Sequence, residues 1–237
     1  EYCSKGLIFN TKVRIKPKYK DLISKINNFN TEAKKKISIL KRIFPNLISF
    51  QTRNIPHLGH EQVIKYLIKK HNHVVINPVL GPKKKNDIRI SALIECFNFL
   101  IKNYYKGKIS LIPIIANMYY AGPKEALHHA IMRRRFGFKN FYVGRDHAGT
   151  LGYYHPFDAI KYAKLYGKET EIKILTTKGG VYCPSCKDYL VRGDCSHKVL
   201  DISGTEFRKH LKEKKIFKHA RKDLQEFVFK KLKNLFY

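Results

Sequence analysis

One stretch of ten residues, Gln51–His60, combines side chains that bind phosphate groups. It places one cation, Arg53, and two imidazoles, His57 and His60, close together in the chain. The imidazoles are three residues apart, so they share a face if a helix begins there. Gly59 lies between them, and its lack of a side chain lets a ligand approach the backbone closely. These residue types predict a site that binds the phosphates of a nucleotide and acts on them.

The chain around this stretch predicts a strand before it and a helix after it. Residues 47–50 form a short apolar run typical of a buried strand, and apolar residues recur at helical spacing over 58–70. The start of a helix commonly binds phosphate, because its first N–H groups are unpaired and its dipole is positive there. The expected elements therefore suit the expected chemistry.

The same alternation continues along the chain. Further strands are expected at 73–79, 109–114, 140–143 and 171–175, and further helices at 88–103, 123–136 and 156–167. Continuous apolar strands that alternate with amphipathic helices predict an α/β fold, a Rossmann-like parallel sheet with helices on both faces. Ligands of such sheets lie beyond the carboxyl ends of the strands. The polar loops 51–57, 81–87 and 144–149 all fall at that edge.

The remaining segments suggest a division into four parts. Residues 1–20 carry short β-like pieces and look like the tail of another unit, and 21–43 predict two short helices. The boundaries that we expect are 1–20, a catalytic α/β domain at 21–175, a metal-binding loop at 176–200, and a helical segment at 201–237. The last segment is basic and divides into helices at 203–213 and 219–236.

The composition is strongly basic, with 48 Lys and Arg against 18 acidic residues and a net charge of +30. Such an excess suits nucleic acid, an anionic membrane surface or small anionic substrates as partners. The basic residues are spread over the whole length, so we interpret most of them as solvated lysines. We expect some to line a site for anions and expect neither a nucleic-acid nor a membrane partner, since no apolar stretch approaches the length of a membrane span.

The cysteines indicate a metal site rather than disulfide bonds. Their number, five, is odd, and three of them cluster, which favours a reducing compartment and a cytoplasmic location. The other two, Cys3 and Cys96, have no expected partners.

The clustered cysteines form the pattern C-x2-C-x8-C-x-H with Cys183, Cys186, Cys195 and His197. Three thiols and an imidazole in one short segment suit a closed, tetrahedral zinc site. The spacing of one residue between the third cysteine and the histidine is tight, so His210 is an alternative fourth ligand. We expect a structural role, because four protein ligands leave no open position for a substrate.

Gly144–Gly149 forms a second candidate loop after the strand at 140–143. Arg145 can bind phosphate, and Asp146 can accept a hydrogen bond from a ribose hydroxyl. The alternative is an ordinary loop that contains an ion pair. Its position at the same sheet edge as the first loop favours the functional interpretation.

Two predicted helix starts are further candidates for a functional role. Ser203 is the expected N-cap of one helix, with Glu206 completing a capping box, which is a sufficient structural explanation of that segment. The other helix begins at Pro123, a residue favoured at the first helical position. It carries His129, which we expect at the surface.

Four motifs together resemble the ATP sulfurylases, or sulfate adenylyltransferases. The run Phe50–His60 resembles the FQTRNPxHxxH stretch of that family, and Gly144–Gly149 matches its GRDHAG loop. Met118–Ala126 resembles MRYAGPREA, and Ile202–Arg208 matches ISGTEhR. The motifs follow the family's order over about residues 44–230. The segment 57–60 also resembles the HxGH signature of the wider nucleotidylyltransferase (HUP-type) superfamily, and the cysteine cluster is similar to the zinc loop of bacterial and archaeal members.

The resemblance implies the first step of sulfate activation, as in sulfate assimilation. ATP and sulfate give adenosine 5′-phosphosulfate and pyrophosphate, reversibly, by in-line attack of sulfate on the α-phosphorus. Zn²⁺ would be structural and Mg²⁺ would arrive with ATP. The resemblance further implies a homo-oligomer, with a dimer expected, and makes residues 1–20 the end of an N-terminal PUA-like β domain.

The resemblance also implies roles for individual residues. The catalytic positions would be Thr52, Arg53, Asn54, His57 and His60. Sulfate would be bound by Gln51, Arg53 and the backbone of Ala148. The nucleotide would contact Gln51, Asn54, Gly144, Arg145, Asp146 and His147.

Two positions depart from the family pattern, and three other functions compete with this one. Tyr119 and Lys124 stand where the family usually has Arg, and Lys cannot reproduce a bidentate grip. One alternative is an adenylyltransferase with a different acceptor, against which Gln51 and Arg53 argue because they suit a small dianion. A zinc-containing nucleic-acid-binding protein would leave the Gly144–Gly149 loop unexplained. An inactive, degenerate relative is the third alternative.

Overall fold

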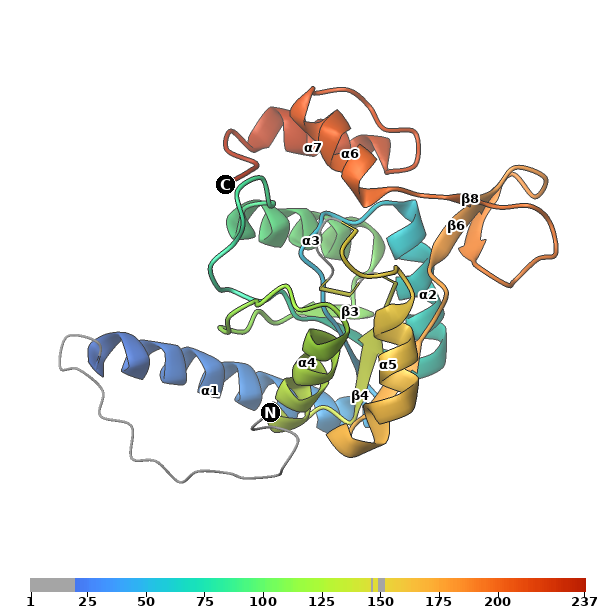
Figure 1. Ribbon diagram of the computed structural model, residues 1–237. Helices are drawn as coiled ribbons and strands as arrows, with labels where there is room; N and C mark the ends of the chain where they lie inside the picture. Colours follow the sequence, from blue (N-terminus) through green and yellow to red (C-terminus); the bar gives the residue numbers. More distant parts are fainter. Residues whose placement is uncertain (1–19, 146, 149–151) are drawn as a thin grey trace.

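A five-stranded parallel sheet lies at the centre of the computed structural model, which describes residues 20–145, 147–148 and 152–237 (Figure 1). Its strand order is β3-β2-β1-β4-β5, and every pair of neighbours is parallel. The strands are β1 (Ile48–Phe50), β2 (Val74–Ile76), β3 (Ile109–Leu111), β4 (Asn140–Val143) and β5 (Lys173–Thr176). The predicted α/β fold with a parallel sheet is confirmed.

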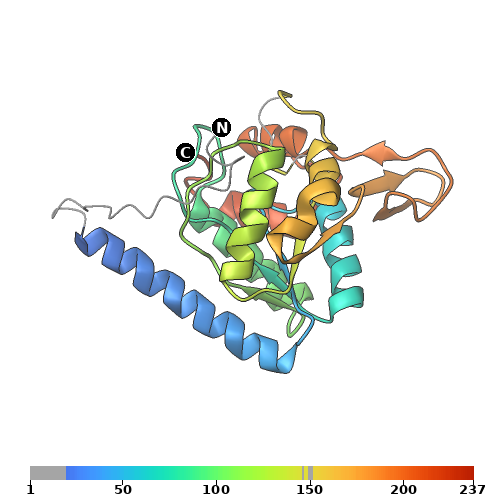
Figure 2. The same ribbon diagram turned by 60° about the horizontal axis from the view of Figure 1, so that its bottom comes forward.

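Helices cover both faces of the sheet, because successive strand residues point to opposite sides. Val74 and Ile76 belong to one buried cluster and Val75 to the other. The first cluster includes residues of α2 (Leu58–His71), α3 (Ile90–Tyr104), α6 (Gly204–Lys212) and α7 (Lys222–Lys231). The second includes residues of α1 (Lys20–Ile43), α4 (Pro123–Arg135) and α5 (Asp158–Tyr166), which a 3₁₀ turn, Gly167–Thr170, follows. α4 and α5 lie side by side (Figure 2).

The segment predicted as two short helices forms the single 24-residue helix α1. No Pro or Gly interrupts it, and Asn30 at its middle bonds the segment that follows β3 instead of breaking the helix. The Asn30 amide donates to the Ile115 carbonyl at 3.0 Å and accepts the Ile115 N–H at 2.9 Å. The prediction of two helices is therefore wrong. The expected β-like pieces before α1 lie outside the described residues.

A small antiparallel sheet extends from the body of the molecule (Figure 1). Its strands are β6 (Gly180–Cys183), β7 (Asp188–Val191) and β8 (Leu200–Asp201), in the order β7-β6-β8. β6 and β7 lie within the segment 176–200, where the sequence indicated a loop, and β8 begins at the last residue of that segment. They hold the turns that carry the cysteines.

The chain ends beside the parallel sheet. The expected helix at 219–236 is shorter, since residues after α7 pair with the loop before α3. The Tyr237 N–H donates to the Asp87 carbonyl at 3.0 Å, and Phe236 forms an antiparallel bridge with Ile88. In the described part of the chain, every helix is too short or too polar to cross a membrane.

Candidate active site

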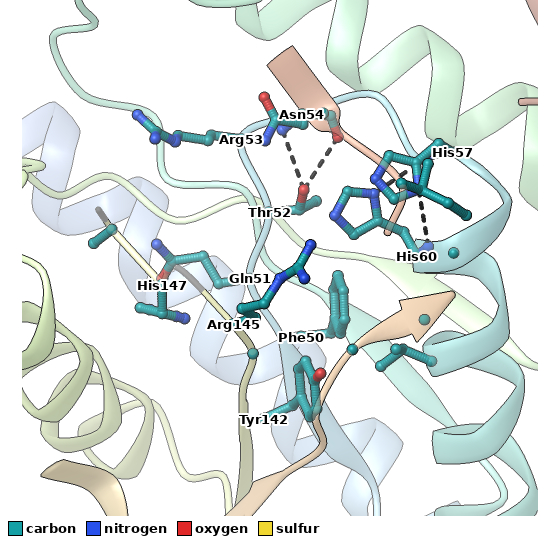
Figure 3. Close-up of a pocket in the computed structure, with 18 of the residues that line it drawn as sticks. Phe50, Gln51, Thr52, Arg53, Asn54, His57, His60, Tyr142, Arg145 and His147 are labelled. Carbon is teal, nitrogen blue, oxygen red and sulfur yellow. Dashed lines mark hydrogen bonds between the residues drawn. The ribbon is translucent and has the colours of Figure 1, made fainter. Parts of the chain in front are cut away.

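The first turn of α2 is built by His57 and His60, whose rings cap each other's backbone (Figure 3). His57 Nδ1 accepts the His60 N–H at 3.3 Å, and His60 Nδ1 accepts the His57 N–H at 3.5 Å. The two rings stack with their centroids 3.8 Å apart. This is a capping box in which imidazoles replace the usual hydroxyl and carboxylate. The helix start and the orientation of both rings therefore depend on the same contacts.

Both imidazoles are neutral at pH 7. Burial is the main cause: it lowers the pKa of His57 well below its ordinary value and the pKa of His60 to about 4. The nearby Arg145 guanidinium lowers both pKa values further. Because each Nδ1 accepts a backbone N–H, each neutral ring carries its proton on Nε2. The two histidines thus present neutral N–H donors, which suit phosphate oxygens.

Thr52 and Asn54 shape the loop between β1 and α2. Thr52 Oγ1 accepts the Asn54 N–H at 3.1 Å, and Asn54 Oδ1 accepts from Arg208 Nη1 at 2.6 Å (Figure 3 shows the first contact). Arg208 belongs to α6, whose expected N-cap, Ser203, accepts the Glu206 N–H at 3.1 Å. Because Asn54 Oδ1 accepts from Arg208, the side chain presents its amide N–H groups, which have no partner among the described residues.

Gln51 presents a buried amide to the same region. Its Nε2 lies 3.8 Å from Met118 Sδ, and its Oε1 is buried without a hydrogen-bond partner among the described residues. A buried amide atom that lacks a partner costs free energy. A rotation of the amide by 180° would place the N–H donors in that position instead. This part of the site therefore suits a polar ligand.

Arg53 points to the opposite side of the loop from His57 and His60 (Figure 3). Its Nη1 lies 3.8 Å from Asp87 Oδ1, and its guanidinium lies 5.2 Å from the centre of the Tyr120 ring. The Tyr120 hydroxyl donates to Asp87 Oδ2 at 2.7 Å. Arg53 is thus held by the segments after β2 and β3 as well as by its own loop.

The loop after β4 carries Arg145, which donates to Asp201 of β8. Arg192 donates to the same carboxylate oxygen at 2.7 Å. Burial raises the pKa of Asp201, but the two guanidiniums outweigh it and the net shift is downward. Ala148 ends the described part of the loop with a φ of 54°, and its carbonyl accepts the Gly122 N–H at 3.1 Å. The ion pair expected for an ordinary loop is therefore present, in a loop that also faces the cavity.

One cavity of about 220 Å³ at the carboxyl edge of the sheet brings these groups together. Its lining includes ten of the predicted site residues: Gln51, Thr52, Arg53, Asn54, His57, His60, Gly144, Arg145, His147 and Ala148. Phe50 and Tyr142 also line it and stack with their ring centroids 5.3 Å apart (Figure 3). Asp146 lies outside the described residues. The two predicted loops thus meet where the sheet topology places them.

A second group of functional side chains lies in the small sheet. One ligand atom from each of Cys183, Cys186, Cys195 and His197 lies within 4.8 Å of the others. His197 Nδ1 is 3.2 Å from Cys186 Sγ and 3.7 Å from Cys183 Sγ. Ligand atoms of tetrahedral zinc are roughly 3.6 Å apart, given its bond lengths of about 2.0–2.3 Å. The Cys186 N–H lowers the pKa of the Cys183 thiol to about 7, which favours the thiolate that a metal needs.

The other proposed fourth ligand, His210, lies elsewhere. Its ring packs on Phe217 with centroids 5.2 Å apart, and its Nε2 lies 4.0 Å from a Glu206 carboxylate oxygen. His197 therefore completes the four-residue cluster, and His210 does not join it.

Comparison with known proteins identifies the family. A family model for ATP-sulfurylase matches residues 29–220. The chain belongs to the ATP-sulfurylase family. This agrees with the resemblance of its four motifs.

Two curated relatives of this ATP-sulfurylase chain show the extent of the match. It is 35% identical over 182 residues to sulfate adenylyltransferase of Persephonella marina, which covers 75% of this chain and 47% of the relative. It is 40% identical over 171 residues to that of Ignicoccus hospitalis, covering 70% and 44%. The chain thus spans about half the length of the curated relatives it matches.

A solved structure supports the fold. The structure titled hexameric APS kinase from Thiobacillus denitrificans matches with a TM-score of 0.63 at 15% identity. The match covers 86% of this ATP-sulfurylase chain and 39% of that chain. At this identity the similarity concerns the fold alone.

The sequence interpretation missed two residues behind the cavity, Glu125 and His129. His129 was expected at the surface, but it is fully buried, so that expectation is wrong. Ala126 and Ala130 are also buried, and His129 lies between them on the same helical face. The apolar spacing of α4 was the signal that could have placed His129 inside.

Proposed function

We propose that this chain carries the catalytic region of a sulfate adenylyltransferase, which converts ATP and sulfate to adenosine 5′-phosphosulfate and pyrophosphate. One observation supports this most: the loops after β1 and β4 bring ten residues of the family motifs into one cavity. The curated relatives carry the name sulfate adenylyltransferase. Because they are about twice as long, the activity of the whole protein is a proposal for this chain.

The reaction needs positioning and charge neutralisation more than it needs an acid or a base. Sulfate is a weak nucleophile, and the α-phosphorus is surrounded by negative charge, so the donors must hold both anions in line. In our proposal His57 and His60 donate from Nε2 to the phosphates as pyrophosphate leaves. Asn54 donates from its amide to the α-phosphate, and no covalent enzyme intermediate forms.

The acceptor side of the cavity would bind sulfate. Gln51 and Arg53 suit a small dianion, and the backbone of Ala148 would complete the contact. Thr52 would maintain the loop that carries them, through its bond to the Asn54 N–H. Gly144, Arg145, Asp146 and His147 would contact the nucleotide; the last of these is considered below.

Two metals enter the proposal with different roles. Zn²⁺ would be held by Cys183, Cys186, Cys195 and His197, whose donor set and spacing fit it. All four positions would be filled by protein, so its role would be structural. Mg²⁺ would arrive with ATP, since the cysteine cluster is the only group of His, Cys, Asp or Glu side chains among the described residues that is close enough to hold a metal ion.

The remaining expectations stay part of the proposal. We propose a cytoplasmic enzyme that forms a homo-oligomer, with a dimer expected. We also propose that the chain divides into four parts, with boundaries after residues 20, 175 and 200. Sedimentation of the purified chain measures the oligomeric state. A chain that stays monomeric at all concentrations would contradict the proposed homo-oligomer and nothing else in the proposal.

The decisive assay is the release of pyrophosphate from ATP that depends on added sulfate, with Mg²⁺ present. ATP formation from adenosine 5′-phosphosulfate and pyrophosphate tests the reverse direction. We expect turnover in both directions, and its absence in both would contradict the proposed function. Alternative acceptors such as phosphopantetheine, tested in the same assay, separate the competing adenylyltransferase function.

A matched pair of variants locates the site. Arg53→Ala should lower sulfate-dependent turnover by about a hundredfold or more, since one stabilising donor is commonly worth that much. Arg134→Ala is the control, because Arg134 lies on α4 and pairs with the exposed Glu171 outside the cavity. Equal melting temperatures would show that both variants fold. Retained turnover in Arg53→Ala would mean that the site is misassigned.

A further inference from the structure

Glu125, His129 and His147 form a row of side chains that leads from inside α4 to the cavity. His129 Nε2 lies 3.2 Å from Glu125 Oε1, at ion-pair distance but outside hydrogen-bond alignment, and has no other partner among the described residues; both side chains are buried. On its other side, His129 Nδ1 lies 3.0 Å from His147 Nε2. His147 lines the cavity, whereas neither Glu125 nor His129 does. The row therefore connects a buried carboxylate to a residue that faces the proposed substrates.

The same carboxylate also holds a neighbouring segment of backbone. Glu125 Oε1 accepts the Tyr119 N–H and Oε2 accepts the Ala121 N–H, each at 2.8 Å. The next residue, Gly122, donates its N–H to the Ala148 carbonyl at 3.1 Å. The start of α4 thus contacts the loop that contains His147 at two points. One is the side-chain contact between His129 and His147, and the other is the backbone hydrogen bond from Gly122 to Ala148.

These contacts determine where the protons lie. Burial raises the pKa of Glu125, but His129 and the two backbone N–H groups outweigh it and lower the pKa to about 2. Burial lowers the pKa of His129 to about 4, although Glu125 opposes the shift, and it lowers the pKa of His147 well below its ordinary value. The carboxylate is therefore ionised and both imidazoles are neutral at pH 7.

One arrangement of protons satisfies this geometry. The nitrogen of His129 that faces an ionised carboxylate must carry the proton, because two acceptors repel each other. Nδ1 of His129 is then an acceptor, and His147 donates to it from Nε2. His147 consequently keeps Nδ1 unprotonated, as an acceptor.

We propose that Glu125 and His129 are positioning residues that keep His147 protonated on Nε2, and that His147 therefore recognises the nucleoside rather than the anions. The proposal rests on the proposed function. Sulfate and the phosphates present only acceptors at neutral pH, whereas the ribose hydroxyls and the adenine amino group present donors. With its one N–H committed to His129, His147 can accept from the nucleoside but cannot donate to sulfate or phosphate.

The protonation state can be read directly in the chain without substrate. Nitrogen NMR of the histidine rings distinguishes a protonated ring nitrogen from an unprotonated one, and His147→Gln assigns the signals of His147. We expect His147 to be protonated on Nε2 alone at pH 7. Substituting His129→Leu should remove this preference and give a mixture of tautomers. A wild-type His147 that carries its proton on Nδ1 would overturn the proposal.

Substrate affinities provide an independent test. His129→Leu should weaken ATP binding, measured by calorimetry, by about tenfold, because the His147 ring loses the contact that fixes both its orientation and its Nε2 proton. His129→Asn retains an acceptor near the position of Nδ1 and should stay within about twofold of wild type. His128→Leu, at the exposed neighbouring position on α4, is the control and should bind ATP as wild type does. The KM for sulfate should change by less than about twofold in all three.

Two results on the variants would overturn the proposal. Equal weakening in His129→Asn and His129→Leu would indicate that His129 has only a packing role. A rise in the KM for sulfate with unchanged ATP affinity would place His147 at the anion. If the wild-type chain binds ATP without turnover, the proposed function fails while the NMR and affinity tests still decide. If it does not bind ATP, the NMR result decides alone.

Discussion

Gly59 and Gly180 contact each other backbone to backbone, where the first turn of α2 meets strand β6. A Cβ on Gly180 would lie 1.9 Å from the Gly59 carbonyl oxygen, and a Cβ on Gly59 would lie 2.8 Å from the Gly180 carbonyl oxygen. Real atoms do not approach this closely, so both positions require glycine. The contact joins the first turn of α2 to the sheet that carries the cysteine cluster.

Gly180→Ala should therefore destabilise the chain and displace α2. Inserting a methyl group against rigid backbone costs about 1–3 kcal/mol, since neither element can yield locally. Chemical unfolding measures the loss, and ATP affinity should fall with it because His57 and His60 move. Gly204→Ala is the control for stability alone, since its Cβ would meet no atom within 4 Å but Gly204 lines the cavity. Equal stabilities for the two variants would contradict the close contact.

Asn54→Asp should lose activity without losing stability. The carboxylate still pairs with Arg208, as Asn54 Oδ1 does at 2.6 Å, so the link between the loop and α6 is retained. It replaces the amide N–H donor by a negative charge that repels ATP. We expect kcat/KM to fall about a hundredfold or more, in line with the loss of one preorganised donor. An unchanged melting temperature with normal turnover would show that the Asn54 amide does not face the substrate.

His57 and His60 should make the fold sensitive to acid. The pKa of His60 is about 4 in the folded chain and that of His57 is also lowered, whereas both titrate near pH 6.5 when unfolded. Between these values the unfolded chain binds more protons, so the free energy of unfolding decreases as pH falls from about 6.5 toward 4. Above pH 6.5 these groups contribute no slope.

Each such histidine contributes up to about 1.4 kcal/mol per pH unit in that window. Urea unfolding at several pH values between 7 and 5 measures the slope. His60→Gln should reduce the slope relative to wild type, whatever it does to stability at pH 7. A free energy of unfolding that stays constant between pH 6.5 and 5 would contradict neutral, buried imidazoles.

Zinc removal should affect the small sheet first. Protein purified without chelators should contain one zinc per chain, and Cys186→Ser should lose it because one of four ligands is gone. Removal should lower the melting temperature, because metal binding and folding of such a segment are coupled. Cys96→Ala is the control: Cys96 is a buried residue of α3 and lies outside the cluster. Wild-type protein that contains no zinc would contradict the proposal that the cysteine cluster is a zinc site.

The sequence was sufficient for the features that depend on local periodicity and on a general rule of sheet topology. Apolar runs alternating with amphipathic helices predicted all five strands of the parallel sheet, and the rule for ligand sites placed both loops at one edge. The four candidate metal ligands lie within a short segment, so their spacing alone brought them together. His210 remained an alternative fourth ligand, because the spacing of residues along the chain does not show where a side chain points.

Other features depend on contacts between distant segments, which periodicity does not encode. α1 continues through its Asn-rich middle because Asn30 bonds Ile115, a residue 85 positions away. His129 is buried because the loop after β4 places His147 against it. Arg53 points toward Asp87 because the loop after β2 lies beside its own loop in the sheet.

The sequence by itself determined the order of the elements, the edge of the sheet where the site forms and the residue types that meet there. Tertiary structure decided which atoms of those residues are occupied by other groups of the protein. Whether an imidazole presents a donor or an acceptor depends on what its other nitrogen contacts: backbone N–H groups for His57 and His60, and His129 for His147. Those partners are brought into contact by packing, so the chemistry of each ring is settled only in the folded chain.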